Sequence, residues 1–214
     1  SEDNETLYPQ IKGVICHHVA RVPSNWRMTD SLPNFLAKHH IPGLQGIDTR
    51  ELVRKLRQYG TLRGIMTDNV TDIKDKIEQL KQTSPTQNII SKVSTKESYA
   101  NPGTKRTVVV LEKKKKNSIL RELNKRNCNA IVLPYNASIS EIMTFNPDGI
   151  LLSNGPGDPL EMTTIAETVA ELEKHVPIFG ICMGHQIFAL ANGAKTYKMK
   201  FGHRGFNHPV RNLK

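Results

Sequence analysis

The run Gly180-Ile181-Cys182-Met183-Gly184 places a cysteine between two glycines, where a predicted strand meets a predicted helix. The strand is the apolar run 176–179, which we expect to be buried, and the helix covers 187–192 and ends at Gly193. A tight turn there holds the side chain away from the sheet, and the glycines let backbone and substrate approach closely. The N-terminus of the helix favours thiolate over thiol. The pattern therefore favours a nucleophile at Cys182 over a small buried cysteine in a strand–helix corner.

A second motif, the loop Ser153-Asn154-Gly155-Pro156-Gly157-Asp158-Pro159, comes one strand–helix unit earlier. Gly155 and Gly157 let the backbone present N–H groups to a ligand, and the two prolines restrict the loop. The N–H of Met183, directly after the cysteine, is a further donor that could stabilise an oxyanion. Taken alone, the loop is more simply a tight turn after a strand. Its position before the cysteine motif is what favours a role in binding.

The second half of the chain alternates predicted strands and helices. The predicted strands are the apolar runs 107–111, 130–133, 149–152 and 176–179. The predicted helices cover about 117–126, 139–143, 161–174 and 187–192. This order is typical of a parallel sheet that helices cover on both faces. Ligands of such sheets bind beyond the carboxyl ends of the strands, so we expect both motifs to share one site.

The first hundred residues follow a different pattern. Strands are predicted at 11–19 and 62–67, and helices at 31–39, 48–59 and 71–81. Turn signals at 101–104 place a domain boundary near residues 100–105. We therefore predict an α/β fold, in which part of a smaller mixed α/β domain at 1–104 precedes a C-terminal domain at 105–214 with a parallel sheet covered by helices.

The composition of the 214 residues is that of an ordinary globular protein. No apolar stretch approaches the roughly 20 residues that cross a bilayer, and no secretory signal is visible, so we expect a cytoplasmic protein without a membrane partner. The cysteines Cys16, Cys128 and Cys182 are widely spaced, which argues against a disulfide framework and for a reducing compartment. The absence of a CxxC pair suggests no metal site.

The net charge of +10 raises the question of whether the chain binds nucleic acid. The most concentrated basic run, Lys113–Lys116, has no aromatic residues interleaved for base stacking. A solvated loop is the favoured interpretation, and a basic face for an acidic partner protein is the other. We expect no nucleic acid partner.

Together the two motifs resemble those of class I glutamine amidotransferases. The segments 23–27, 41–50 and 198–210 resemble more closely the small, glutamine-hydrolysing subunit of carbamoyl phosphate synthetase. The resemblance runs from about residue 10 to the end. It implies that 1–104 is part of the N-terminal domain of that subunit and that 105–214 is its amidotransferase domain.

The resemblance also implies roles for individual residues. Cys182 would attack the side-chain amide of glutamine, form a glutamyl thioester and release ammonia. The N–H of Met183 and one from the Gly155–Gly157 loop would hold the oxyanion, and Gln186 would help to bind glutamine. His185 follows the family pattern without being the triad base, and orienting the turn is its favoured role.

In this family the ammonia passes to a large synthetase subunit, which uses ATP and Mg to make carbamoyl phosphate for arginine and pyrimidine synthesis. We therefore expect glutamine and a large subunit as partners, and no cofactor in this chain. Three alternatives remain: an inactive module that docks on a synthetase, a glutaminase that serves another synthetase, and a cysteine protease. The first hundred residues disfavour the second, because they resemble only the carbamoyl phosphate subunit.

The chain departs from the family pattern in three ways. The resemblance implies that the chain is truncated at both ends: it lacks the N-terminal segment of the family, and the triad His and Glu lie beyond Lys214. We therefore expect the 214 residues alone not to turn over glutamine. Lysines follow Glu112 where the family has an aromatic residue and a glycine. A lysine held at positive φ there would cost about 1 kcal/mol.

Overall fold

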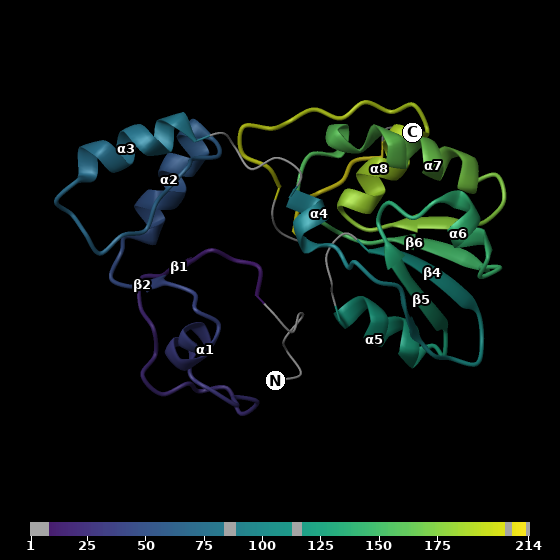
Figure 1. Cartoon of the computed structure of the whole chain (residues 1–214), viewed down its shortest axis with the longest axis horizontal. Helices are drawn as coiled ribbons and strands as arrows, with labels where there is room; N and C mark the ends of the chain where they lie inside the picture. Colours follow the sequence, from purple (N-terminus) through teal and green to yellow (C-terminus); the bar gives the residue numbers. More distant parts are fainter. Residues whose placement is uncertain (1–8, 84–88, 113–116, 204–206, 213–214) are drawn as a thin grey trace. The chain divides into compact units, whose positions relative to one another are not determined.

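A computed structural model describes residues 9–83, 89–112, 117–203 and 207–212 (Figure 1). The chain forms two compact units: the larger contains Thr86–Thr196, and the smaller contains Ile11–Pro85 and Tyr197–Lys214. The predicted domain boundary at residues 104 and 105 stays a prediction.

The larger unit contains a five-stranded sheet in the order β3-β5-β4-β6-β7. Four strands are parallel, namely β4 (Thr107–Glu112), β5 (Asn129–Pro134), β6 (Gly149–Leu152) and β7 (Ile178–Gly180). The first three match the continuous apolar runs of the sequence, which is the pattern of strands buried on both faces. The predicted α/β fold is confirmed. The sequence did not predict β3 (Tyr99–Asn101), which pairs antiparallel with β5.

Helices pack on the two faces of this sheet. They are α4 (Ile89–Val93), α5 (Asn117–Lys125), α6 (Ile139–Met143), the short 3-10 helix η1 (Pro159–Met162), α7 (Thr163–Leu172) and α8 (Met183–Ala191). Figure 1 shows α5 on one side of the sheet and α7 and α8 on the other. Alternate residues of β4 follow this division, since Val109 packs in the cluster with α7 and α8 and Val110 in the cluster with α5. The predicted helices are confirmed within a few residues.

Strand β7 is not buried as the sequence suggested. Phe179 is 66% exposed. Its register partner is Leu151, which packs in the core cluster on the α5 side of the sheet. Because α5 lies against β5, two strands from β6, the described residues leave the α5 side of β7 open. The prediction that helices cover both faces of the sheet is therefore confirmed only for its central strands.

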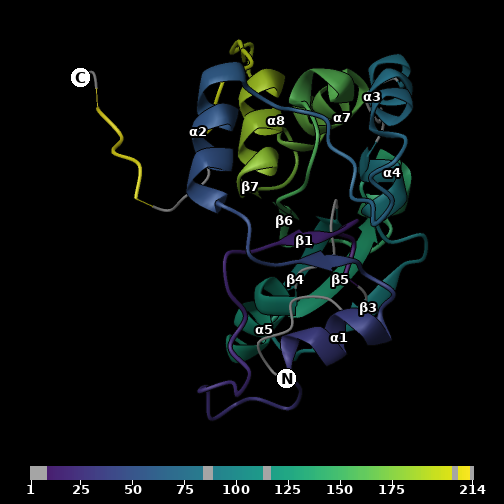
Figure 2. The ribbon, with the colours of Figure 1, turned by 90° about the vertical axis from the view of Figure 1, so that its left-hand side faces the viewer.

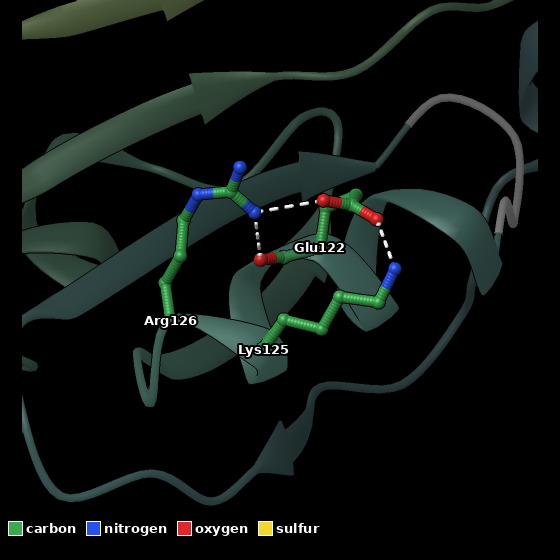
Figure 3. Close-up of polar contacts among 3 residues, drawn as sticks. All are labelled: Glu122, Lys125 and Arg126. Carbon is green, nitrogen blue, oxygen red and sulfur yellow. Dashed lines mark hydrogen bonds and ion pairs between the residues drawn. The ribbon is translucent and has the colours of Figure 1, made fainter.

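The solvent side of α5 carries a small ion-pair network (Figure 3). Glu122 lies between Lys125 and Arg126, with a nitrogen of each 2.7 Å from a carboxylate oxygen. Hydrogen bonds from Lys125 and Arg126, in that order, lower the pKa of Glu122 to about 2. The network belongs to the surface of the helix, away from its packed face.

The smaller unit has little regular structure. Strands β1 (Val14–Ile15) and β2 (Gly43–Leu44) run side by side and parallel (Figure 2), with α1 (Leu32–Lys38), α2 (Thr49–Tyr59) and α3 (Ile73–Gln82). The three predicted helices are confirmed. Ser31 and Asp48 cap the first two through their side chains.

The predicted strands of the smaller unit are shorter or absent. The strand predicted at 11–19 is reduced to β1, and the strand predicted at 62–67 is wrong, because these residues have no regular structure. Leu62 is 46% exposed and Ile65 is 53% exposed. An apolar run forms a strand only when a partner strand accepts its hydrogen bonds, and no described segment does so.

The sequence predicted neither a membrane-spanning segment nor a metal site, and the following findings concern the described residues only. Among them, no helix is long and apolar enough to cross a membrane. No group of three His, Cys, Asp or Glu side chains among them could hold a metal ion. The lysine run 113–116, together with the strain predicted there, lies outside the described residues.

Candidate functional site

Cys182 occupies a strained turn between β7 and α8. It is the N-cap of α8, with φ 54° and ψ −109°, a backbone conformation that L-residues rarely adopt. Its side chain is exposed and its thiol is free. A strained, exposed nucleophile between a strand and a helix is the geometry known as a nucleophile elbow. The helix also directs the positive end of its dipole at this residue.

The two glycines beside Cys182 are required by close backbone packing. A Cβ on Gly184 would lie 2.2 Å from the carbonyl oxygen of Leu152, and one on Gly180 would lie 2.6 Å from the backbone of Gly184. The same Leu152 oxygen accepts a hydrogen bond of 3.0 Å from the N–H of Ile181. The end of β6 therefore fixes the turn that carries the cysteine.

The first turn of α8 places three predicted site residues. Gln186 follows Cys182 by four residues, and its N–H donates to the Cys182 carbonyl over 3.1 Å. Both side chains are exposed and, at this spacing, lie on one face of the helix. The side chain of Met183 is 4% exposed, whereas its N–H opens the helix and has no intrahelical acceptor. His185 is exposed, and no hydrogen bond of its ring to another described residue supports an orienting role.

The loop after β6 is held at both ends. At its start, the N–H of Ser153 donates to the Leu111 carbonyl over 3.1 Å. At its end, the Asp158 carboxylate accepts from the N–H of Leu160 over 3.0 Å and caps η1. Gly157 has a φ of +102°, which other residues adopt only with strain. These contacts restrain the loop in addition to its prolines.

The loop and the cysteine turn meet at the carboxyl edge of the sheet. Strands β6 and β7 are parallel neighbours, and Leu152 is in register with Gly180. Neighbouring strands lie about 5 Å apart, so the loop and the turn begin side by side. The structure thus brings Gly155, Gly157, Met183, Cys182 and Gln186 to one edge, as the sequence predicted, while their individual roles stay predictions. A thiol beside backbone donors is suited to acyl transfer from an amide.

One feature of the loop was not predicted. Ser153 is 2% exposed, and its hydroxyl donates to the carbonyl oxygen of Asn154 over 3.1 Å. The sequence offers only a weak signal for this bond, because serine next to a turn often bonds nearby backbone.

Comparison with known proteins agrees with this geometry. Residues 109–214 match the family model of class-I glutamine amidotransferases, and residues 1–66 match that of the carbamoyl-phosphate synthase small chain, CPSase domain. The carbamoyl phosphate synthase pyrimidine-specific small chain of Lactiplantibacillus plantarum is 51% identical over 212 residues, which is 99% of this chain. The chain belongs to the carbamoyl phosphate synthase small-chain family.

Other members of this small-chain family are similarly close. The small chains of Bacillus cereus and of Lactococcus lactis subsp. lactis are 50% and 47% identical, each over 99% of this chain. The chain spans 58% of the length of the first two relatives and 59% of the third. Cys182 and the loop after β6 both lie within the part that matches the amidotransferase model.

Proposed function

We propose that the protein hydrolyses glutamine through Cys182 and supplies the ammonia to a large synthetase subunit for carbamoyl phosphate synthesis. The observation that carries this proposal is the exposed Cys182 in a strained turn at the start of α8. A structural cysteine would need neither the exposure nor the strain. Membership of the small-chain family supports the same reaction.

The proposed chemistry follows from the positions of the groups. The Cys182 sulfur attacks the side-chain amide carbon of glutamine, and the carbonyl oxygen becomes an oxyanion. The N–H of Met183 and one N–H of the Gly155–Gly157 loop stabilise it. The carbon–nitrogen bond then breaks, ammonia leaves with a proton, and water hydrolyses the thioester to glutamate and free thiol. These proton transfers require a general base.

The proposal includes partners that this chain does not contain. The term small chain in the names of the relatives supports a large-chain partner, where ATP and Mg are expected to act. That this chain itself needs no cofactor stays a prediction, as does a cytoplasmic location. The pyrimidine-specific name of the Lactiplantibacillus plantarum relative supports pyrimidine synthesis over arginine synthesis as the use of the product.

Replacing the nucleophile tests the proposal in the full-length subunit with its large subunit. Cys182→Ala should reduce glutamine-dependent synthesis and glutamine hydrolysis by at least about a thousandfold, because no thioester can form. Synthesis from free ammonia should remain. Cys128→Ala, at a half-buried free cysteine, is the matched control and should retain both activities.

The docking alternative makes the opposite prediction. If the subunit only activates a synthetase, Cys182→Ala will change neither activity. Alkylation by iodoacetamide provides a second criterion: glutamine should protect Cys182, identified by peptide mass spectrometry. Unprotected alkylation together with an active Cys182→Ala variant would exclude the proposed reaction.

A further inference from the structure

We propose that Ser153 is a positioning residue, whose hydroxyl fixes the peptide between Asn154 and Gly155 so that the Gly155 N–H points at the oxyanion. This inference rests on the proposed function. It names the group that orients a donor of the loop.

Ser153 is itself rigidly placed. It is the first residue after β6, and its N–H continues the hydrogen bonding between β6 and β4 through the Leu111 carbonyl. The residue is 2% exposed, so neighbouring atoms limit its rotamers. A side chain fixed in this way can restrain the group that it bonds.

The group that it bonds is the carbonyl oxygen of Asn154, at 3.1 Å. This oxygen belongs to the same peptide unit as the N–H of Gly155. A trans peptide is planar, and its C=O and N–H point in opposite directions. No described peptide bond is cis. Holding the oxygen on the Ser153 side therefore directs the Gly155 N–H away from Ser153.

This peptide needs a restraint because glycine follows it. Gly155 can accept a wide range of φ, so rotation of the whole peptide by half a turn meets little steric resistance. A rotated peptide would present a carbonyl oxygen, which repels an oxyanion. The Ser153 hydroxyl favours the orientation that presents the N–H.

The neighbouring residue holds the other half of the site. The Leu152 carbonyl accepts from Ile181 and lies against Gly184, on either side of Cys182. Two consecutive residues of one strand end thus fix the thiol and the loop donor.

The test is Ser153→Ala in the full-length subunit with its large subunit. We expect kcat for glutamine hydrolysis to fall at least about tenfold and KM for glutamine to change less than about twofold, because an oxyanion donor acts only in the transition state. An aldehyde analogue of glutamine, which adds to the thiol and forms an oxyanion, should lose affinity by a factor similar to the fall in kcat. The alkylation rate of Cys182 by iodoacetamide should not change.

Two further variants separate positioning from folding. Ser153→Cys keeps the size and a weak donor, so its kcat should lie between those of wild type and Ser153→Ala. Ser138→Ala removes the hydroxyl that caps α6 and should lower stability without lowering kcat. A Ser153→Ala variant with kcat within twofold of wild type would overturn the inference. So would a fall in kcat matched by slower alkylation of Cys182, since the whole site would then be disturbed.

The two proposals fail in different experiments. If Cys182→Ala retains glutamine hydrolysis, the proposed function is wrong. If hydrolysis depends on Cys182 but not on Ser153, only the positioning role is wrong.

Discussion

Because Gly184 has no side chain, the turn that carries Cys182 can lie close to the sheet. Gly184 packs against the carbonyl of Leu152, and a methyl group there would come within 2.2 Å of that oxygen. The obstacle is strand backbone, which cannot rotate away as a side chain could. The turn carrying Cys182 would have to move instead.

Gly184→Ala should therefore impair both folding and chemistry. Overpacking of this kind costs about 1–3 kcal/mol of unfolding free energy. Displacement of the turn should also lower glutamine hydrolysis at least tenfold, as roughly 1 Å of misplacement can do. Gly64→Ala is the control, because a Cβ at Gly64 meets nothing within 4 Å. Urea denaturation and glutaminase assays measure the two effects, and a Gly184→Ala variant equal to Gly64→Ala would contradict the steric argument.

At the scale of an element, α5 has a packed face and a charged face. Leu120 and Leu123 pack against the sheet, whereas Glu122 pairs with Lys125 and Arg126 in solvent. Exposed pairs of this kind contribute little to stability, and salt screens them. The charged face therefore serves solubility and local order of the helix more than the core.

The pKa of Glu122 offers a direct check of this network. The folded pKa is lowered from 4.5 to about 2, so the pair stabilises the fold above pH 4.5 and the effect is lost as pH falls toward 2. NMR titration of the Glu122 carboxyl carbon should give a midpoint below 4.5. In a Lys125→Met, Arg126→Met variant the midpoint should return towards the ordinary value. Equal midpoints in the two proteins would show that the network does not form.

At the scale of the whole chain, the two units differ in how much they bury. In the larger unit Val109, Val132 and Leu152 are fully buried, whereas α2 and α3 contain no buried residue. Ile73 and Ile77 of α3 are 48% and 45% exposed. Helices without buried contacts depend on local bonds and open easily.

Hydrogen exchange should reveal this difference in the 214-residue chain. Amides of β4 and β5 should be the slowest, exchanging only in global unfolding, and amides of α2 and α3 should exchange at least about a hundredfold faster. Mass spectrometry of peptic fragments measures both groups in one sample. Protection of α3 equal to that of β4 would show that its apolar face is covered.

The sequence predicted the features that depend on local chemistry. Buried parallel strands give continuous apolar runs, so β4, β5 and β6 were found. Features that depend on a distant partner were missed: β3 pairs through the free edge of β5, and Phe179 is exposed because no described element covers it.

In the candidate site, too, the sequence predicted some features and missed others. The motif around Cys182 and the glycine loop were visible because their residue types are unusual at strand ends. The contact of Gly184 with Leu152 and the bond from Ser153 to Asn154 are relations between atoms, and residue types alone do not encode them.

At Cys182 the backbone conformation lowers the stability of the fold but holds a reactive thiol in the turn. Its φ of 54° is a conformation that glycine would adopt with less strain, whereas a cysteine there costs on the order of 1–3 kcal/mol. If stability alone mattered, glycine would be favoured at this position. A chemical role for the sulfur is the reason to keep cysteine there. The molecule spends part of its folding energy to keep a thiol where water and small molecules can reach it.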